Sequence, residues 1–163
     1  MKGLNLTVFL LVLIVALTGC KQDEIFNAAE QAELDEAAIV VYLKNIGVYE
    51  KAIRDDESGI YYVIEEQGTG IKPTFGSTVF THYSGYFLTG ELFDTSLATP
   101  GPLDFVLGRG DVIPGWDRGF SLIEKGTQAL FIIPSGLAYG NNGSSGIPPN
   151  SILQFDVNLI DVR

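Results

Sequence analysis

The chain has 163 residues, ten of them basic and twenty acidic, which gives a formal net charge of −10. This length fits one globular domain and a short additional segment, and the charge disfavours nucleic-acid partners. One cysteine, Cys20, and one histidine, His82, are too few for an intrachain disulfide, a Cys/His zinc site or a Cys–His nucleophilic pair. The sequence also lacks a phosphate-binding loop and a complete dinucleotide fingerprint. We expect neither a metal nor a cofactor.

Residues 1–19 have the layout of a secretory signal peptide, with Lys2, an apolar run from about Leu6 to Leu17, and small residues before Cys20. The rival interpretation is a transmembrane anchor, but the uncharged span is shorter than the roughly 20 residues needed to cross a bilayer core. The ending "LTGC" resembles a bacterial lipobox, in which the cysteine is lipidated and becomes the new N-terminus. We therefore expect lipid attachment at Cys20.

The residues after Cys20 carry a sorting signal by resemblance. Lys21 follows the cysteine, and in lipoprotein sorting patterns a residue other than Asp at this place favours the outer membrane. The nearby Asp23 and Glu24 resemble surface-export signals. We expect a lipid-anchored protein of the bacterial outer membrane that faces the periplasm or the cell surface.

The segment from Asp23 to Ile46 contains no Gly or Pro and is acidic in its first half. Apolar side chains at i, i+3, i+4 and i+7 predict an amphipathic helix, namely Ile39, Tyr42, Leu43 and Ile46. Lys44 and Gly47 suit its C-terminus. The helix is interpreted as a spacer or as docked on the domain, with a dimerisation helix as the alternative. Residues 20–57 then comprise the lipidated N-terminus, this helix and a linker in which residues 54–57, "RDDE", form a solvated turn.

From residue 58 onward, short apolar runs are separated by glycines, which is typical of strands. We expect strands at residues 60–66, 78–88, 91–96, 103–107, 128–133 and 152–160. The last has the clearest alternation, which predicts one buried and one wet face. Only residues 115–123 look helical. Five or six mostly antiparallel strands and one short helix share a core only if the sheet curls over the helix, so the expected fold class is α+β.

Strand periodicity turns a set of aromatic side chains toward the same interior: Tyr83, Phe93, Phe105, Trp116, Phe131, Tyr139 and Phe155. Taken singly, each is most simply a core residue. Trp116, at the start of the expected helix, should lie between helix and sheet, near the floor of any cavity that the sheet leaves open.

Three stretches in order, "THYSGYFLTGELFDTS" (81–96), "FVLGRGDVIPGWDRGF" (105–120) and "PSGLAYGNNGSSGIPPNSILQFDVNLI" (134–160), resemble motifs of the FKBP-type peptidyl-prolyl cis-trans isomerases. The resemblance runs from about residue 58 to the end of the chain, so residues 58–163 are expected to form an isomerase domain. The acidic helix that follows the cysteine is similar to the lead-in of lipoprotein members of this family.

The resemblance implies an apolar pocket for a proline ring and assigns residues to it. The implied catalytic residues are Tyr83, Phe93, Asp94, Ile113, Trp116, Tyr139 and Phe155. The implied substrate-binding residues are Phe105, Val112, Ile147 and Leu103. It also implies that the Ile113 N–H and the Tyr139 hydroxyl donate hydrogen bonds to a bound peptide and that Asp94 lies near the twisting carbonyl.

Some positions leave alternatives open. Asp94 has a second interpretation as a turn-stabilising carboxylate. Leu103 stands where a rim aromatic is often found, and the loop at residues 143–149, "GSSGIPP", looks one residue short. His82 precedes Tyr83 on one strand, so it faces away from the pocket if Tyr83 faces into it, and we expect it to be structural.

Rotation about an Xaa-Pro bond needs no nucleophile, which agrees with a site of rings and aliphatics without a titrating dyad. We predict a peptidyl-prolyl cis-trans isomerase that assists the folding of exported proteins, with proline-containing polypeptides as substrates and macrolides as candidate ligands. The alternatives are a non-catalytic proline-binding module or holdase, and a tethered scaffold that acts through its helix.

Overall fold

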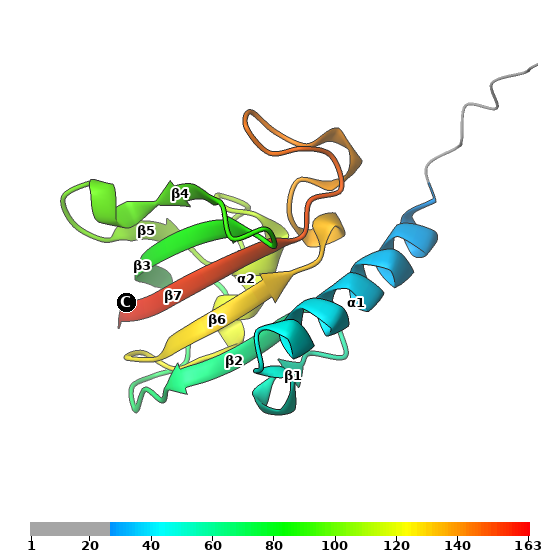
Figure 1. The fold of residues 1–163 in the computed structure, drawn as a ribbon. Helices are drawn as coiled ribbons and strands as arrows, with labels where there is room; N and C mark the ends of the chain where they lie inside the picture. The colour runs from blue at the N-terminus through cyan, green and yellow to red at the C-terminus, as the bar shows by residue number, and fades with distance from the viewer. Residues whose placement is uncertain (1–26) are drawn as a thin grey trace, which may run out of the picture.

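The computed structural model describes residues 27–163 (Figure 1). The expected signal peptide, Cys20 and the expected sorting residues lie outside this part of the chain. A seven-stranded sheet with the order β1-β2-β6-β7-β3-β4 forms the body, and β5 also pairs with β3. Every strand pair is antiparallel. The strands are β1 (Ile53–Arg54), β2 (Tyr61–Glu66), β3 (Thr78–Phe87), β4 (Leu92–Thr95), β5 (Leu103–Val106), β6 (Gln128–Ile133) and β7 (Leu153–Val162).

The expected α+β fold is confirmed, and the sheet has one strand more than expected. The additional strand is β1, which pairs with β2 inside the segment interpreted as a linker. Its two residues are too few to show an alternation. β4 and β5 lie along different halves of the same edge of β3. The edge of β3 that faces away from β7 is therefore shared by two strands.

The helix α2 (Pro114–Leu122) packs on one face of the sheet and carries Trp116 and Phe120 into the main core. Two of its glycines meet the sheet closely: an added Cβ would come within 2.4 Å of Ile133 Cγ2 at Gly115 and within 2.8 Å of Phe131 Cε2 at Gly119. Pro114 occupies the first turn, where its missing N–H has no helical partner to lose. The glycines therefore set the depth at which Trp116 sits.

The helix α1 (Ala28–Asn45) covers the opposite face, over β2 and β6 (Figure 1). α1 begins at Ala28, because Asn27 is extended and its side chain caps the helix by accepting hydrogen bonds from Ala29 N and Glu30 N. Residues 23–26 of the expected helix lie outside the described part of the chain. Ile39 and Leu43 are buried as expected, but Ile46 lies just beyond the last turn and is 42% exposed. α1 is thus docked on the domain.

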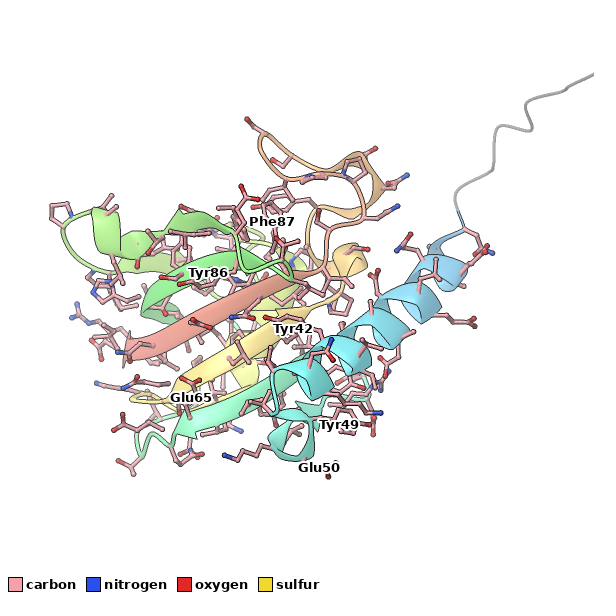
Figure 2. All side chains as sticks on the ribbon, in the orientation of Figure 1. Tyr42, Tyr49, Glu50, Glu65, Tyr86 and Phe87 are labelled. Atoms are coloured by element: carbon pink, nitrogen blue, oxygen red, sulfur yellow. The ribbon has the colours of Figure 1, made fainter. Side chains whose placement is uncertain are left out.

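The end of α1 reaches toward the middle of the sheet, where the Tyr42 hydroxyl donates a hydrogen bond to Gln154 of β7 (Figure 2). The alternation of β7 predicted that this face is exposed to solvent. The contact with Tyr42 covers part of it. None of the helices within residues 27–163 has the length and the apolar character needed to cross a membrane.

Residues 54–57 were expected to be a solvated turn, and this is wrong for Asp55. The Arg118 guanidinium of α2 donates hydrogen bonds to both Asp55 carboxylate oxygens, at 2.9 Å and 2.7 Å. Arg118 also forms an ion pair with Glu57 at 2.6 Å. The hydrogen bonds from Arg118 lower the pKa of Asp55 to about 2. The turn between β1 and β2 is consequently tied to the helix that holds Trp116.

Candidate functional site

A small pocket opens between the first turn of α2, the strands β3, β4 and β7, and the loop that carries Tyr139. Its volume is about 160 Å³. This is smaller than the roughly 300 to 1,000 Å³ of sites for drug-sized ligands, so its size suits one ring of a larger molecule. The lining residues are Tyr83, Phe93, Asp94, Leu103, Asp111, Val112, Ile113, Trp116, Tyr139 and Phe155.

Trp116 forms the floor and is only 4% exposed. Its ring meets Tyr83 at a centroid distance of 4.7 Å and Phe155 at 5.2 Å, in both cases nearly edge to face. Such edge-to-face contacts orient aromatic rings as well as burying them. The Nε1–H of Trp116 is buried and has no acceptor within residues 27–163, which is uncommon for a buried donor. The contacts with Tyr83 and Phe155 therefore hold the Trp116 ring in one orientation at the floor.

Phe93 and Phe155 form one wall, with ring centroids 5.7 Å apart at an interplanar angle of 86°. Both lie over Gly85 of β3, which pairs with Asp94 on one side and Phe155 on the other. A Cβ at Gly85 would come within 2.6 Å of Phe93 Cζ and 3.0 Å of Phe155 Cε1. The wall thus requires glycine here. The sequence analysis missed this role, although a glycine inside a strand is itself a signal of close approach.

Tyr83 and Asp94 meet across β3 and β4 beside this wall. The Tyr83 hydroxyl donates a hydrogen bond of 2.6 Å to Asp94 Oδ2. Burial, and then this hydrogen bond, raise the pKa of Tyr83 above its usual value. Tyr83 therefore stays a neutral donor at physiological pH. Asp94 lies within strand β4 and lines the pocket, so its position differs from that of a turn-stabilising residue.

Ile113 and Tyr139 lie on the other side of the mouth. Ile113 is the N-cap residue of α2, with an extended backbone, and its carbonyl accepts a hydrogen bond from Trp116 N at 2.9 Å. Tyr139 follows the 3₁₀ turn η3 (Ser135–Leu137) and is 40% exposed. Asp111 also lines the mouth and is paired with Arg109. Sequence reasoning did not find Asp111, because no pattern marks it out.

The structure brings nine of the eleven expected pocket residues to the lining, namely Tyr83, Phe93, Asp94, Leu103, Val112, Ile113, Trp116, Tyr139 and Phe155. Phe105 and Ile147 are buried in the main core and do not line the pocket. Strand alternation turns Phe105 under Trp116 and Phe120, at centroid distances of 5.9 Å and 5.5 Å. Ile147 packs into the same core. Phe105 therefore supports the pocket floor through its contact with Trp116.

His82 does not reach the pocket. Its Nδ1 lies 3.1 Å from Ser96 Oγ, and the side chain faces a separate shallow hollow next to Asp156 and Asn158. Within the described chain, no three His, Cys, Asp or Glu side chains gather in a way that would hold a metal ion. The pocket therefore offers apolar surface, hydrogen-bond donors and two carboxylates, of which Asp111 is paired with Arg109.

The sequence of the chain is similar to those of known proteins. Residues 69–160 match the model of the family "FKBP-type peptidyl-prolyl cis-trans isomerase". The chain is 38% identical over 147 residues to the FKBP-type peptidyl-prolyl cis-trans isomerase FkpA of Aeromonas hydrophila, an alignment that covers 90% of this chain and 52% of that protein. It is 43% identical over 114 residues to FkpA of Escherichia coli (strain K12), covering 70% of this chain and 42% of that protein. The chain spans about half the length of these relatives.

Solved structures agree with the fold. The crystal structure of FkpA from Escherichia coli superposes with a TM-score of 0.70 at 38% sequence identity, over 83% of this chain and 62% of that chain. The crystal structure of AtFKBP13 superposes with a TM-score of 0.65 at 31% identity, over 69% of this chain and 98% of that chain. The second match shows that the part of this chain it covers corresponds to nearly the whole of another solved chain.

Proposed function

The chain belongs to the family of FKBP-type peptidyl-prolyl cis-trans isomerases, and on this premise we propose that it catalyses the cis–trans isomerisation of Xaa-Pro bonds in polypeptides. The observation that carries the proposal is the pocket of about 160 Å³ with Trp116 as its floor. It is largely apolar, suited to one ring, and bordered by hydrogen-bond donors and by the carboxylates of Asp94 and Asp111. Catalysis of bond rotation requires no more chemical equipment than this.

The barrier to rotation, about 18–20 kcal/mol, reflects the amide resonance that is lost in the twisted state. In that state the carbonyl oxygen carries less negative charge, so water stabilises it less than it stabilises the planar form. A water-poor pocket removes this advantage of the planar ground state, which lowers the barrier. The rings of Phe93, Phe155 and Trp116 supply the apolar surroundings.

The polar groups at the mouth act on the two sides of the bond. Asp94, held by the Tyr83 hydroxyl, lies near the carbonyl and repels it more in the planar state than in the twisted state, because the oxygen is then more negative. On the other side, the Ile113 N–H and the Tyr139 hydroxyl donate hydrogen bonds to the peptide backbone and hold it across the pocket. These roles follow from the family resemblance, and their support is that Tyr83, Asp94, Ile113 and Tyr139 all line the pocket.

The double variant Phe93→Ala with Asp94→Leu in the full-length chain separates an isomerase from a binding module. We expect it to lose acceleration of cis–trans exchange in an Xaa-Pro peptide while it still binds an unfolded, proline-containing protein. A matched control is Phe80→Ala with Asp104→Leu, since neither residue lines the pocket. If the unmodified chain binds such proteins but leaves the exchange rate unchanged, the non-catalytic binding module or holdase is correct instead.

We also propose that the chain works on exported proteins while lipid-anchored through Cys20 at the outer membrane. The support is the order of Lys2, the apolar run and "LTGC", followed by Lys21. Replacing Cys20 with Ala should move the protein from the membrane fraction to the soluble fraction after cell fractionation. A Cys20→Ala protein that stays with the membrane would contradict lipid anchoring.

Macrolides are proposed as ligands of the same pocket. The rim position Leu103 lines the mouth with an aliphatic side chain, and it stands where related sequences often carry an aromatic one. Replacing Leu103 with Phe should tighten macrolide binding in a calorimetric titration, because an aromatic ring adds contact area. Unchanged or weaker binding would show that this rim position does not control affinity.

A further inference from the structure

Asp35 is an acidic residue in the buried stripe of α1, with only 2% of its surface exposed. Its Oδ2 accepts two hydrogen bonds from Ser135, one from the backbone N–H and one from the hydroxyl, each at 2.7 Å. Its Oδ1 accepts a third from Gln31 Nε2 at 2.8 Å. Burying a carboxylate is costly unless such donors surround it. The contact between Asp35 and Ser135 is therefore specific.

Ser135 begins the turn that leads to the pocket. It is 1% exposed and is the first residue of η3, and the Ala138 N–H closes the turn on the Ser135 carbonyl at 3.0 Å. Only Ala138 separates η3 from Tyr139, and its backbone angles, φ −107° and ψ −113°, lie outside the usual helical and extended regions. The place of Tyr139 at the pocket mouth therefore depends on how η3 is held.

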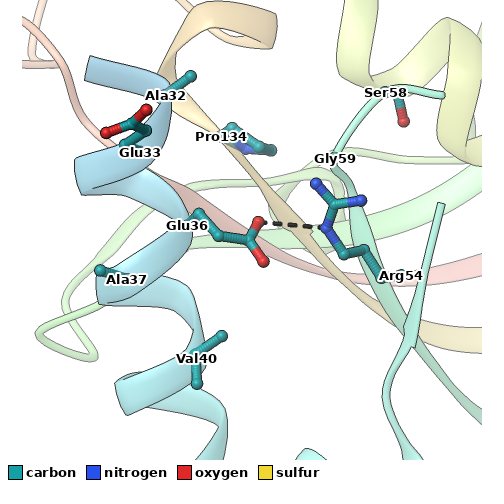
Figure 3. Close-up of a pocket in the computed structure, with 9 residues that line it drawn as sticks. All are labelled: Ala32, Glu33, Glu36, Ala37, Val40, Arg54, Ser58, Gly59 and Pro134. Atoms are coloured by element: carbon teal, nitrogen blue, oxygen red, sulfur yellow. Dashed lines mark hydrogen bonds and ion pairs between the residues drawn. The ribbon is translucent and has the colours of Figure 1, made fainter. Parts of the chain in front are cut away.

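Toward its C-terminal end α1 packs on β2 and β6 through Ile39 and Leu43, but around Asp35 the helix borders a groove. A groove of about 700 Å³ separates the helix from β1 and from Pro134, the residue before Ser135 (Figure 3). Across it, Glu36 and Arg54 form an ion pair at 3.2 Å between side chains that are partly exposed. Surface pairs of this kind contribute little. The hydrogen bonds to Asp35 are thus the main connection between α1 and η3.

We propose that Asp35 is a positioning residue for the pocket, which acts from the N-terminal helix by fixing η3 and, through η3, the place of Tyr139. α1 lies outside residues 69–160, the part of the chain that matches the family model. The pocket of this chain would then depend on an element that the family motifs do not contain. The inference rests on the proposed function, in which the Tyr139 hydroxyl binds the peptide backbone.

The test measures kcat/KM of the full-length chain on an Xaa-Pro peptide for Asp35→Ala, Asp35→Asn and Glu33→Ala. We expect Asp35→Ala to lower kcat/KM about tenfold, which corresponds to about 1.4 kcal/mol. The loss should appear mainly in KM. The Tyr139 hydroxyl bonds the peptide backbone equally in the ground state and the transition state, and such uniform binding affects KM alone. Asp35→Asn keeps an acceptor oxygen and should lose less. Glu33→Ala, exposed on the same helix, should match the unmodified chain.

A double-mutant cycle with Tyr139→Phe distinguishes positioning from general stabilisation. If Asp35 acts through Tyr139, Asp35→Ala should cost less than about twofold once the hydroxyl is gone, because the two effects are then coupled. If Asp35→Ala lowers kcat/KM by the same factor in the unmodified chain and in Tyr139→Phe, the inference is overturned. Should Asp35→Ala fail to fold, Ser135→Ala, which removes only the hydroxyl bond, passes through the same cycle with the same criterion.

The failure of the inference is distinguishable from the failure of the proposed function. If the unmodified chain does not accelerate exchange at all, the proposed function is wrong. The NMR signals of the Tyr139 ring then decide about Asp35. They should shift in Asp35→Asn and stay in place in Glu33→Ala. Ring signals that do not move in Asp35→Asn would overturn the positioning role whatever the activity.

Discussion

The Tyr83 hydroxyl and the Asp94 carboxylate are joined by a hydrogen bond of 2.6 Å that crosses from β3 to β4 beside the pocket. Tyr83 also contacts the ring of Trp116, so one side chain orients both the carboxylate and the floor. The pocket is in this way a coupled arrangement of rings and polar groups. Its parts can be separated by substitutions that each remove one contact.

Replacing Tyr83 with Phe removes the hydrogen bond and leaves the ring. We expect kcat/KM to fall about tenfold, which corresponds to about 1.4 kcal/mol, because a hydrogen bond to a charged group contributes a net of about 1.5–3 kcal/mol. Tyr86→Phe, on the same strand but outside the pocket lining, serves as the control (Figure 2). Isomerase kinetics on both variants check this. Equal activities would show that Asp94 needs no such support.

A methyl group at Gly85 should deform the wall. The alanine Cβ would lie 2.6 Å from Phe93 Cζ, so the ring must move into the pocket or the strands must separate. We expect Gly85→Ala to reduce ligand binding more than tenfold and to lower the free energy of unfolding by about 1–3 kcal/mol, as overpacking does. Gly136→Ala, where an added Cβ meets nothing within 4 Å, is the matched control. Urea denaturation and calorimetry measure both effects.

Acid should weaken the connection between Asp55 and Arg118. Hydrogen bonds from Arg118 lower the pKa of Asp55 to about 2 from the ordinary 3.8. A lowered folded-state pKa means that this stabilisation is complete above about pH 4 to 5 and is lost as the pH falls toward 2. Solvent screening at this partly exposed pair limits it to about 1 kcal/mol. Arg118→Ala should therefore be less stable than the unmodified chain at pH 6 by about this amount.

The pH dependence of that difference is the informative part. In denaturant titrations between pH 6 and pH 2, the unfolding curves of Arg118→Ala and the unmodified chain should converge as Asp55 is protonated. Arg109→Ala, which removes an exposed pair within one loop, should show little change at any pH. A difference that stays constant down to pH 2 would mean that Arg118 stabilises the fold by packing alone.

Binding should be visible in the fluorescence of Trp116, the only tryptophan of the chain. Because its ring is the pocket floor, a bound proline ring changes its surroundings directly. We expect a saturable change in emission on titration with a proline-containing peptide, and none with the same peptide carrying Ala for Pro. An identical response to both peptides would place the binding site elsewhere.

The strands and the short helix of the domain were predictable because their periodicity is strong. β6 lies at the predicted residues 128–133, and α2 begins one residue before the predicted 115–123. The pocket residues were assigned through family motifs, and nine of them line one cavity. Phe105 was expected to bind substrate, but it packs against Trp116 in the core and does not line the cavity, which depends on how β5 packs under α2.

The contacts of the N-terminal segment could not be predicted, and the reason is physical. β1 is stabilised by its pairing with β2, which leaves no local pattern in two residues. Asp35 interrupts the apolar stripe of α1. Its burial is explained by donors on Ser135, a hundred residues away in sequence. Long-range hydrogen bonds of this kind depend on tertiary structure alone. The cap of α1 at Asn27 was also not predicted.

The central claim is that the pocket speeds rotation about the Xaa-Pro bond, and NMR exchange spectroscopy tests it most directly. Without catalysis, cis and trans forms of a proline peptide interconvert in tens to hundreds of seconds. A catalytic amount of the full-length chain should produce exchange cross-peaks between the two forms at sub-second mixing times, and Phe93→Ala with Asp94→Leu should abolish them. Absence of these cross-peaks, at concentrations where Trp116 fluorescence shows the peptide bound, would contradict the account.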